Sequence, residues 1–553
     1  MNPAQLLSHF DRISDAPDVV PRLRHFILDL AIRGKLAEQN AKDEPASALL
    51  VRVQEEKERL VKAGEIRKEK PQIPLSEEDL PFDVPMYWKW IQLAEIGFIN
   101  PRNSAEDTTQ ASFIPMTLIS AEYGIPSKQE VRPWGEIKSG FTHFADGDVA
   151  LAKITPCFQN GKSTVLRDLT GGIGAGTTEL HVVRPLFVNP DYVLIFLKSP
   201  HFIEAGIPLM TGTAGQKRVS TEYFANSPFP LPPLAEQHRI VATVDELMAL
   251  CDRLETAQAE RESRRDRLAA VSLNRLNQPA DEPSAFQDHA RFYFNHLSRL
   301  TTRGEHVEQL RQTILNLAVR GKLVLQNPND EPANELLKRM GAKTSENVPF
   351  PIPDLWAWVP VGQIGDSRLG KMLDKAKNKG TLRRYLRNIN VRWFDFNLSD
   401  VFEMPFEDDE LDEFALHAGD VLICEGGEPG RAAVWDKREE DIYFQKAIHR
   451  VRFAEGVDPH FFVNTLRESA DSGRLAAYFT GVGIKHFTGK GLASFVFPLP
   501  PLAEQHRIVA KVDELMALCN QLEAQLTTTH TESRRFLEAV LHEALTPALE
   551  KIA

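Results

Sequence analysis

The sequence has little cysteine and no long apolar run. None of its four cysteines (Cys157, Cys251, Cys424 and Cys519) belongs to a C-x-x-C pair. This spacing disfavours a disulfide framework or a zinc ribbon, so reduced thiols are expected. No stretch approaches the roughly 18 apolar residues of a membrane span, and residues 1–15 lack the basic start and apolar core of a signal peptide. We therefore expect a cytoplasmic protein without a membrane segment.

Positive charge is also in deficit. The formal net charge is −12 at pH 7, whereas nucleic-acid-binding proteins usually carry a basic surface. Taken alone, this charge argues against such a protein. The objection weakens if the basic residues are grouped locally, or if a partner protein supplies positive surface.

Motifs that would carry catalysis or hold a metal ion are missing. Residues 160–163 read NGKS and look like the end of a phosphate-binding loop, but that loop needs a glycine where Pro156 stands. The 16 histidines show no metal-ligand spacing. We therefore predict no catalytic residue, no metal site and no cofactor bound by this chain.

The sequence does contain a large internal repeat. Residues 229–255 read FPLPPLAEQHRIVATVDELMALCDRLE, and residues 497–523 repeat them almost unchanged. The differences are Thr243/Lys511, Asp252/Asn520 and Arg253/Gln521. A weaker repeat relates LRHFILDLAIRGKL, from Leu23, to LRQTILNLAVRGKL, from Leu310. Such repeats indicate an architecture in which one structural unit occurs twice.

Two blocks of equal length lie between these repeated arms. Trp88 and Phe229 are separated by 141 positions, and so are Trp356 and Phe497. The interiors of the blocks differ widely. We therefore expect the two arms to have the same function, and the two blocks to have related but different functions. The simpler alternative is a recent duplication in which the arms have not had time to drift.

Each copy of the strong repeat predicts a long helix. Apolar residues follow the 4-3-4-3 spacing of a coiled-coil seam. They are Ile240, Val244, Leu247, Cys251 and Leu254 in the first copy, and Ile508, Val512, Leu515, Cys519 and Leu522 in the second. The first helix continues to near Pro279, which makes a rod of roughly 65 Å. We expect the two helices to pair in antiparallel fashion; the alternative is an amphipathic helix packed on its own domain.

The blocks are predicted to mix strands, short helices and loops. HFADGDVALAKIT and HAGDVLICEGG each place a turn before a buried strand, and Pro190 and Pro459 each open a helix. The predicted fold class is α+β. It has two mixed α/β blocks, separated by long antiparallel coiled-coil helices, in a pseudo-two-fold internal repeat.

The second block contains a basic stretch that suits DNA. Residues 368–392 hold nine Lys or Arg against one acid, Asp374. Such side chains neutralise phosphates, and Arg can read guanine edges. The alternative is a solvated loop balanced by the acidic run 407–413. The nine are Arg368, Lys371, Lys375, Lys377, Lys379, Arg383, Arg384, Arg387 and Arg392.

Other DNA-contact candidates follow a glycine in each block. Lys217 and Arg218 follow Gly215, as Lys485 and His486 follow Gly483. Gln216 could supply an amide contact to adenine. Lys153 and Lys162 complete the candidates in the first block.

PLPPLAEQHRIV, present twice and followed each time by a long helix, resembles the conserved regions of type I restriction–modification specificity subunits. The resemblance spans nearly the whole chain. It implies two target-recognition domains that read the halves of a bipartite, asymmetric site in double-stranded DNA. It also implies two docked modification subunits, which methylate adenine, and further restriction subunits with translocase and nuclease activities. S-adenosylmethionine, ATP and magnesium are then expected on those partner subunits.

The resemblance also suggests domain bounds and docking residues. The bounds are 1–84 for an N-terminal helical arm and linker, 85–233 for target-recognition domain 1, 234–348 for a central helical spacer, 349–501 for target-recognition domain 2 and 502–553 for a C-terminal spacer helix. The expected spacer and docking residues are Leu234, Glu236, Gln237, His238, Arg239, Ile240, Val244, Leu247 and Leu254, with Leu502, Glu504, Gln505, His506, Arg507, Ile508, Val512, Leu515 and Leu522. The N- and C-terminal arms are expected to meet and complete a second copy of the central region.

Two other functions stay open at this point. One is a coiled-coil protein scaffold that does not read DNA. The other is a single-chain DNA methyltransferase, against which the missing glycine-rich cofactor site counts.

Overall fold

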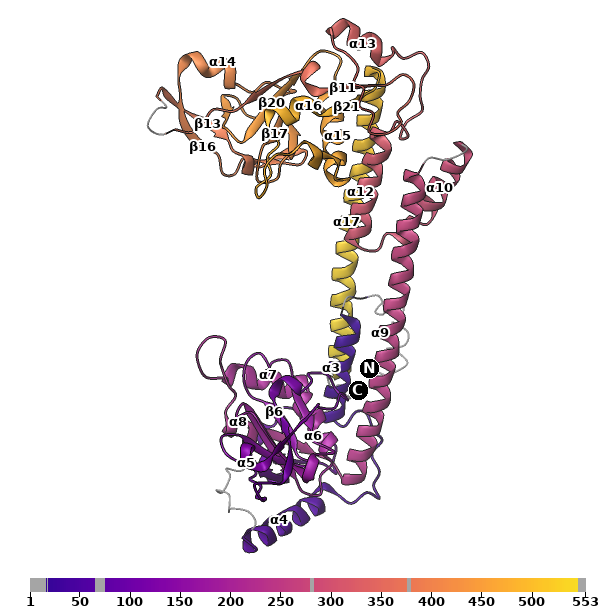
Figure 1. Ribbon diagram of the computed structural model, residues 1–553. Coiled ribbons are helices and arrows are strands. Elements are labelled where there is room, and N and C mark those ends of the chain that lie inside the picture. The colour runs from indigo at the N-terminus through magenta and orange to yellow at the C-terminus, as the bar shows by residue number, and fades with distance from the viewer. Residues whose placement is uncertain (1–15, 17, 65–74, 279–282, 375–378, 546–553) are drawn as a thin grey trace. The chain divides into compact units, whose positions relative to one another are not determined.

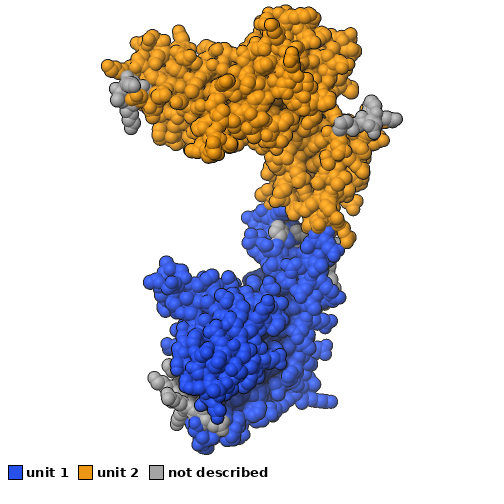
Figure 2. Space-filling model, in the orientation of Figure 1, with its two compact units in different colours: residues 1–260, 530–553 blue, residues 261–529 orange. Residues whose placement is uncertain are grey.

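The computed structural model describes residues 16, 18–64, 75–278, 283–374 and 379–545. The chain divides into two compact units, which are residues 1–260 with 530–553 (unit 1) and residues 261–529 (unit 2), as Figure 2 shows. Each unit contains one block and a group of helices. The five domain ranges expected from the sequence stay a prediction. Among the described residues, no helix is both long and apolar enough to cross a membrane.

Two helices of 44 residues each, α9 (Leu234–Asn277) and α17 (Leu502–Leu545), follow the two blocks (Figure 1). Glu236 and Glu504 lie in their first turns, where a carboxylate favours the helix dipole. The predicted length of the first helix is confirmed. α9 begins in unit 1 and ends in unit 2, whereas α17 begins in unit 2 and ends in unit 1. The predicted α+β fold class with long helices after two similar blocks is confirmed.

In unit 1, the helix α3 (Val19–Ile32) lies against both long helices. The Arg24 guanidinium lies 2.6 Å from the carboxylate of Asp252 and 2.7 Å from that of Glu255, both on α9. Arg22 lies 2.8 Å from the carboxylate of Glu538 on α17. The N- and C-terminal arms therefore meet, as the sequence repeat predicts.

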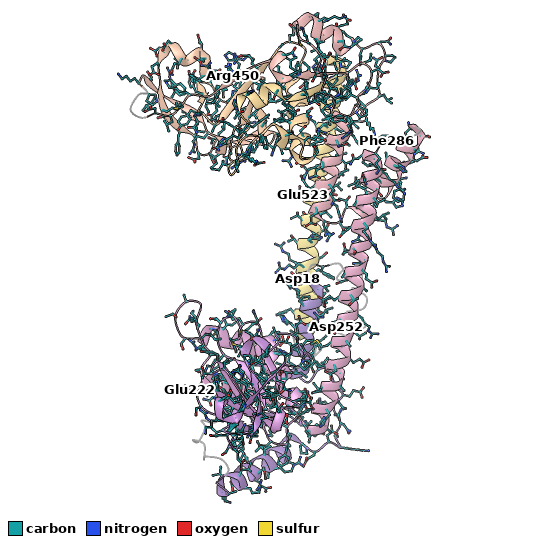
Figure 3. The ribbon with its side chains drawn as sticks, viewed as in Figure 1. Asp18, Glu222, Asp252, Phe286, Arg450 and Glu523 are labelled. Carbon is teal, nitrogen blue, oxygen red and sulfur yellow. The ribbon has the colours of Figure 1, made fainter. Side chains whose placement is uncertain are left out.

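Unit 2 repeats this arrangement with α12 (Gly304–Val319) in place of α3. Arg311, which corresponds to Arg24, lies 2.7 Å from the carboxylate of Glu523 on α17. Arg303 forms an ion pair with Asp266 on α9. Figure 3 labels Asp252 on α9 and Glu523 on α17, and Glu523 corresponds to Glu255 in the repeat. Two further helices, α10 (Pro283–Asn295) and α11 (Leu297–Leu300), add to this unit.

The seam of each long helix is buried against the other long helix in antiparallel order, as predicted, and an arm helix joins the pair. Ile240, Val244 and Cys251 share one core with Phe26 of α3 and Leu537 of α17. Each unit therefore adds a third helix to the predicted pair, which the sequence interpretation did not expect. The physical reason is that α3 and α12 carry apolar stripes of their own, which they bury on the same seam.

The arm helices also bind the far ends of the long helices. The Lys35 ammonium donates to the carbonyls of Ala544, at 3.2 Å, and Leu545, at 2.7 Å, in the last turn of α17. Lys322 donates to the carbonyl of Gln278, just after α9, at 2.9 Å. A cation at a helix C-terminus stabilises the unpaired carbonyls. After each arm helix the chain forms α4 (Ala46–Lys62) or α13 (Ala333–Met340).

Each block is closed by a two-stranded antiparallel sheet. In unit 1, β1 (Lys89–Gln92) pairs with β10 (Pro228–Leu231). In unit 2, β11 (Ala357–Pro360) pairs with β21 (Val496–Leu499) in the same register. The sequence analysis missed β10 and β21, because their prolines were assigned to the start of the following helix. A two-stranded ribbon has only edge strands, which tolerate proline.

The first block contains two four-stranded sheets, ordered β2-β9-β6-β7 and β4-β3-β8-β5. Their strands are β2 (Gly97–Ile99), β3 (Gln110–Ile114), β4 (Glu130–Pro133), β5 (Thr142–Ala145), β6 (Val149–Ala152), β7 (Ser163–Val165), β8 (Ile173–Gly176) and β9 (Leu180–Pro185). The helices are α5 (Trp134–Ile137), α6 (Pro190–Lys198), α7 (Pro200–Gly206) and α8 (Thr221–Asn226).

The second block has a matching sheet, β12-β20-β17-β18, a three-stranded sheet, β16-β13-β19, and the pair β14-β15. Its strands are β12 (Gly365–Leu369), β13 (Thr381–Leu386), β14 (Val391–Arg392), β15 (Asp395–Phe396), β16 (Phe402–Phe406), β17 (Val421–Cys424), β18 (Ala432–Val434), β19 (Ile442–Phe444) and β20 (Ile448–Phe453). Its helices are α14 (Leu411–Phe414), α15 (Pro459–Asp471) and α16 (Gly489–Ser494).

The turn-and-strand and proline-start predictions within the blocks are confirmed. Gly147 and Gly419, with φ of 84° and 90°, form the turns before the buried strands β6 and β17. Positive φ is the region that glycine adopts at least cost. Helices α6 and α15 begin at Pro190 and Pro459, each after a side chain that caps the first turn.

Candidate nucleic-acid interface

A short loop with paired ends projects from each block at the same place in the repeat. Loop 1 is residues 211–218, and loop 2 is residues 480–486. In loop 1, the amides of Thr211 and Arg218 each donate to the other's carbonyl, at 3.0 and 2.8 Å. In loop 2, the amides of Thr480 and His486 do the same, both at 2.9 Å. All seven residues of loop 2 are exposed, and Gln216 and Lys217 of loop 1 are exposed as well.

A buried histidine holds the end of each loop. His181 Nε2 lies 3.1 Å from the carbonyl of Val219, and His449 Nε2 lies 3.0 Å from the carbonyl of Phe487. A carbonyl only accepts, so Nε2 carries the proton in both rings. Burial lowers the pKa of His181 to about 4, and that of His449 also falls because of burial. Both histidines therefore stay neutral near pH 7 and fix the loop to the central sheet of its block.

The same sheets contain a matched ion pair in which the carboxylate is buried and the arginine is half-buried. Arg184 donates to both oxygens of Asp148, each at 2.8 Å, and Arg452 donates to both oxygens of Asp420, each at 2.7 Å. Each carboxylate also accepts an amide of the turn before it, from Ala145 and His417 respectively. Removing one partner from such a pair leaves an uncompensated buried charge. The frame under each loop is thus rigid and the same in both blocks.

The loops lie in stretches without acidic residues, although the chain as a whole is acidic. No Asp or Glu occurs in residues 205–221 or in residues 472–503. A groove of about 680 Å³ lies beside the end of loop 2 and is lined in part by Lys446, His449 and Gly489. Lys446 is exposed. The local charge of these two stretches suits a polyanion.

The basic stretch of the second block is largely neutralised within the block. Arg368 pairs with Glu413, and Lys371 is buried between Glu407 and Glu410. Arg384 and Arg387 pair with Glu439 and Asp400, respectively, each at 2.6 Å. These four side chains are therefore less available to DNA than the sequence suggests, because the acidic run and nearby loops fold back on them.

Three cations of this stretch have no ion pair in the described part of the chain. They are Lys379 and Arg392, which are exposed, and Arg383, which is half-buried. Arg383 Nε is buried without a hydrogen-bond partner there. Lys375 and Lys377 lie outside the described residues. The sequence signal was thus a local excess of charge, and only the fold separates paired from unpaired cations.

In the first block, the candidates fall into two groups. Gln216 and Lys217 are exposed on loop 1, whereas Arg218 pairs with Glu179 at 2.8 Å. Lys153 and Lys162 are half-buried at the foot of the loop and in the neighbouring turn. Gln216 and Lys217 therefore stay the strongest candidates for DNA contact in this block.

Most of the expected docking residues have partners inside their own unit. Gln237 accepts the amide of Asn189 at 2.9 Å, and Gln505 accepts that of Asp458 at 2.7 Å. Glu236 accepts from Gln39 of the arm, as Glu504 accepts from Gln326.

Arg239 and Arg507 also bind their arms. They pair with Asp43 and Asp330, each at 2.6 Å. The near-identity of the two copies of the PLPPLAEQHRIV motif thus has a structural reason that the sequence interpretation missed. Each copy binds both a block and an arm through its side chains. His238 and His506 are the exposed members of the motif.

The described residues contain no group of three or more His, Cys, Asp or Glu side chains that could hold a metal ion. Near loop 1, the Glu179 carboxylate is used in an ion pair with Arg218. The arrangement can bind a ligand and position it, because it holds exposed loops on a rigid frame.

Comparison with known proteins identifies the family. The pattern of the family described as "Type I restriction modification DNA specificity domain" matches residues 87–262 and 353–529. The chain is 37% identical over 563 residues to the Type I restriction enzyme EcoAI specificity subunit of Escherichia coli, covering 95% of this chain and 94% of the relative. It is 35% identical over 560 residues to the EcoEI specificity subunit of the same species, with the same coverage. The chain therefore belongs to the type I restriction–modification specificity subunits.

A solved structure agrees with this fold. A chain in a structure titled for the complex assembly and conformational transition of the type I R-M system covers 85% of this chain and 100% of its own length, with a TM-score of 0.51 and 18% identity. The chain is thus a specificity subunit and not the catalytic component of such a system.

Proposed function

We propose that this chain reads a two-part, asymmetric site in double-stranded DNA, one half with each block. The observation that carries the proposal is the contrast between the repeated frame and the divergent loops. The same buried histidine, ion pair and closing ribbon support loop 1 and loop 2, but the exposed residues of the loops differ. Different tips on one frame suit two different half-sites. Arg383, Arg392 and Lys379 are proposed phosphate contacts beside the second half-site.

The proposed complex supplies what this chain lacks. Two modification subunits would bind S-adenosylmethionine and methylate adenine, and restriction subunits would use ATP and magnesium in the cytoplasm. The acidic charge of this chain then matters less, because the modification subunits share the contact with DNA.

The test is to express the chain with the modification subunit of its own system and map N6-methyladenine across the host genome by long-read sequencing. We expect one two-part asymmetric motif with a fixed gap, absent when this chain is omitted. No new methylation from a stable complex would contradict DNA reading and favour the scaffold alternative.

A matched pair of exposed leucines suggests where the modification subunits dock. Leu250 of α9 is 43% exposed, and Leu518, at the corresponding position of α17, is 47% exposed. The buried residues of the seam are used within each unit, whereas these two face outward. One partner bound twice requires the same surface twice, and this pair meets that requirement.

We expect Leu250→Ser or Leu518→Ser to weaken one docking site each by about 2 kcal/mol, the loss typical of the few side chains that dominate an interface. Native mass spectrometry should show two modification subunits on the wild type, mainly one on each single variant and few on the double variant. Leu268→Ser, at an exposed leucine elsewhere on α9, is the control. Full occupancy of the double variant would contradict this docking surface.

A further inference from the structure

Two apolar side chains stand in full solvent at the tip of loop 2. Val482 is 102% exposed and Ile484 is 74% exposed. Burying a valine or isoleucine side chain away from water is usually favourable. In the isolated chain neither side chain is buried. An exposed apolar surface of this kind is typical of a site that contacts another molecule.

The loop holds these side chains outward. The paired amides of Thr480 and His486 close its base, and the Lys485 ammonium donates to the carbonyl of Gly481 at 2.9 Å. Gly481 has a φ of 101°, and a Cβ there would lie 2.2 Å from the carbonyl oxygen of Ile484. Phe487, the next residue, is buried and bonded to the main chain of Glu425. The hydrogen bonds therefore hold the tip in a defined conformation, which Gly481 can adopt because it has no side chain.

The surroundings of the tip favour DNA over an apolar protein surface. Lys485, His486 and Lys490 are exposed beside it, in a stretch with no acidic residue. Gly489 and Lys446 line the same groove, and its one acidic lining residue, Glu410, is paired with Lys371. Cations around a small apolar tip can bind phosphates while the tip reaches the bases.

Loop 1 provides the comparison within the chain. It is closed by the same paired amides but carries Thr213, Ala214 and Gln216 at its tip. The two loops thus occupy equivalent places on the repeated frame and offer different chemistry. Loop 1 offers a hydroxyl and an amide, and loop 2 offers two branched apolar side chains.

We propose that loop 2 enters a DNA groove and places Val482 and Ile484 against base surfaces of the second half-site, where they set its sequence preference. The contacted surface is the C5-methyl group of a thymine or the face of an unstacked base step. The inference rests on the proposed function, since it assigns a specificity role within one of the two half-sites.

The experiment uses the full chain in complex with its modification subunit and a duplex that carries the site methylated by the wild type. In the variant Val482→Ser with Ile484→Ser, we expect discrimination to fall about tenfold at one or two base pairs of a single half-site, the order expected for one lost base contact. The other half-site should keep its full preference. Both residues are exposed, so the thermal unfolding of the variant should match that of the wild type.

Two modified duplexes distinguish the contacted surfaces. Replacing thymine by uracil removes only the methyl group, and it should weaken wild-type binding several-fold while leaving the variant unchanged if the methyl is the contact. A 2-aminopurine in the same half-site should brighten on wild-type binding, and not on variant binding, if a base step is opened. Leu325→Ser, which changes another highly exposed leucine (88%) outside the block, is the control and should behave as wild type.

The outcomes separate this inference from the proposed function. A wild-type complex with no sequence preference would overturn both. A wild type that reads its site, together with a variant of unchanged preference at every base pair, would overturn the role of loop 2 alone.

Discussion

Replacing Asp29 by asparagine is expected to stabilise the protein by about 2 kcal/mol at pH 7.5 and to have little effect at pH 4. Asp29 lies on α3, and its Oδ1 is buried without a hydrogen-bond partner in the described part of the chain. Burial raises the pKa of this carboxyl from 3.8 to about 6, although Arg33 and the main chain of His201 oppose the rise. The folded protein therefore ionises Asp29 at a cost that the unfolded chain does not have, at about 1.4 kcal/mol per pKa unit.

The sign of the pH dependence follows from the raised pKa. A carboxyl that binds its proton more tightly in the folded state contributes stability below its unfolded pKa, and that contribution is lost as the pH rises through the folded value. For Asp29, the loss falls between about pH 4 and pH 6. An asparagine has no such titration, so its advantage should grow over the same interval and stay constant above it.

Differential scanning calorimetry at pH 4 and pH 7.5 would measure this change. Glu246→Gln removes an exposed carboxylate from α9 and is the matched control, for which little change is expected at either pH. Equal gains for Asp29→Asn at both pH values would contradict the titration argument. The chain itself supplies the precedent, because the corresponding residue of α12 is Asn316.

The fold was largely predictable from the sequence, because two periodic signals were strong. The near-identical copies defined the repeat, and the seam from Ile240 to Leu254 defined the long helix. Turn glycines before β6 and β17 and the prolines of α6 and α15 were equally legible. Each of these features is local, so a short stretch of sequence contains all the information.

The candidate interface was less predictable, because it depends on contacts between distant segments. The sequence shows Lys371 in a basic stretch and suggests that it is free to bind DNA. In the fold it lies between Glu407 and Glu410. Gln237 is a surface-like polar residue in the motif but is buried against Asn189. The apolar tip of loop 2 was overlooked because Val and Ile usually lie in a core, and only the fold shows Val482 and Ile484 to be exposed.

The matched residues Asp29 of α3 and Asn316 of α12 also determine which block each unit can accept without loss of stability. Asn316 donates to the Glu468 carboxylate at 3.2 Å, and Glu468 is only 3% exposed. In the first block, Ser199 occupies the position of Glu468 relative to the proline that opens the helix. A second block placed in unit 1 would therefore bring Glu468 to Asp29, and two buried carboxylates would repel each other.

A chimaera in which residues 354–496 replace residues 86–228, combined with Asp29→Asn, is expected to lose the first half-site completely. The closing ribbons make the junction compatible, since β1 pairs with β10 in the same register as β11 with β21. Residues 229–231 and 497–499 are both Phe-Pro-Leu, and Arg33 and Arg320 are matched as well. Long-read mapping of N6-methyladenine should show a two-part site whose halves are both the one that the second block reads.

The same chimaera without Asp29→Asn is the internal control for the interface. It should show the same altered methylation motif but unfold at a lower temperature at pH 7.5, because Asp29 then faces Glu468. Retention of the first half-site by a folded chimaera would contradict the assignment of one half-site to each block. A change of motif without the stability difference would retain that assignment and contradict only the packing of Glu468 against α3. The two measurements are independent. The methylation motif reports which DNA sequence the loops contact, and calorimetry reports the stability of the packing between Glu468 and α3.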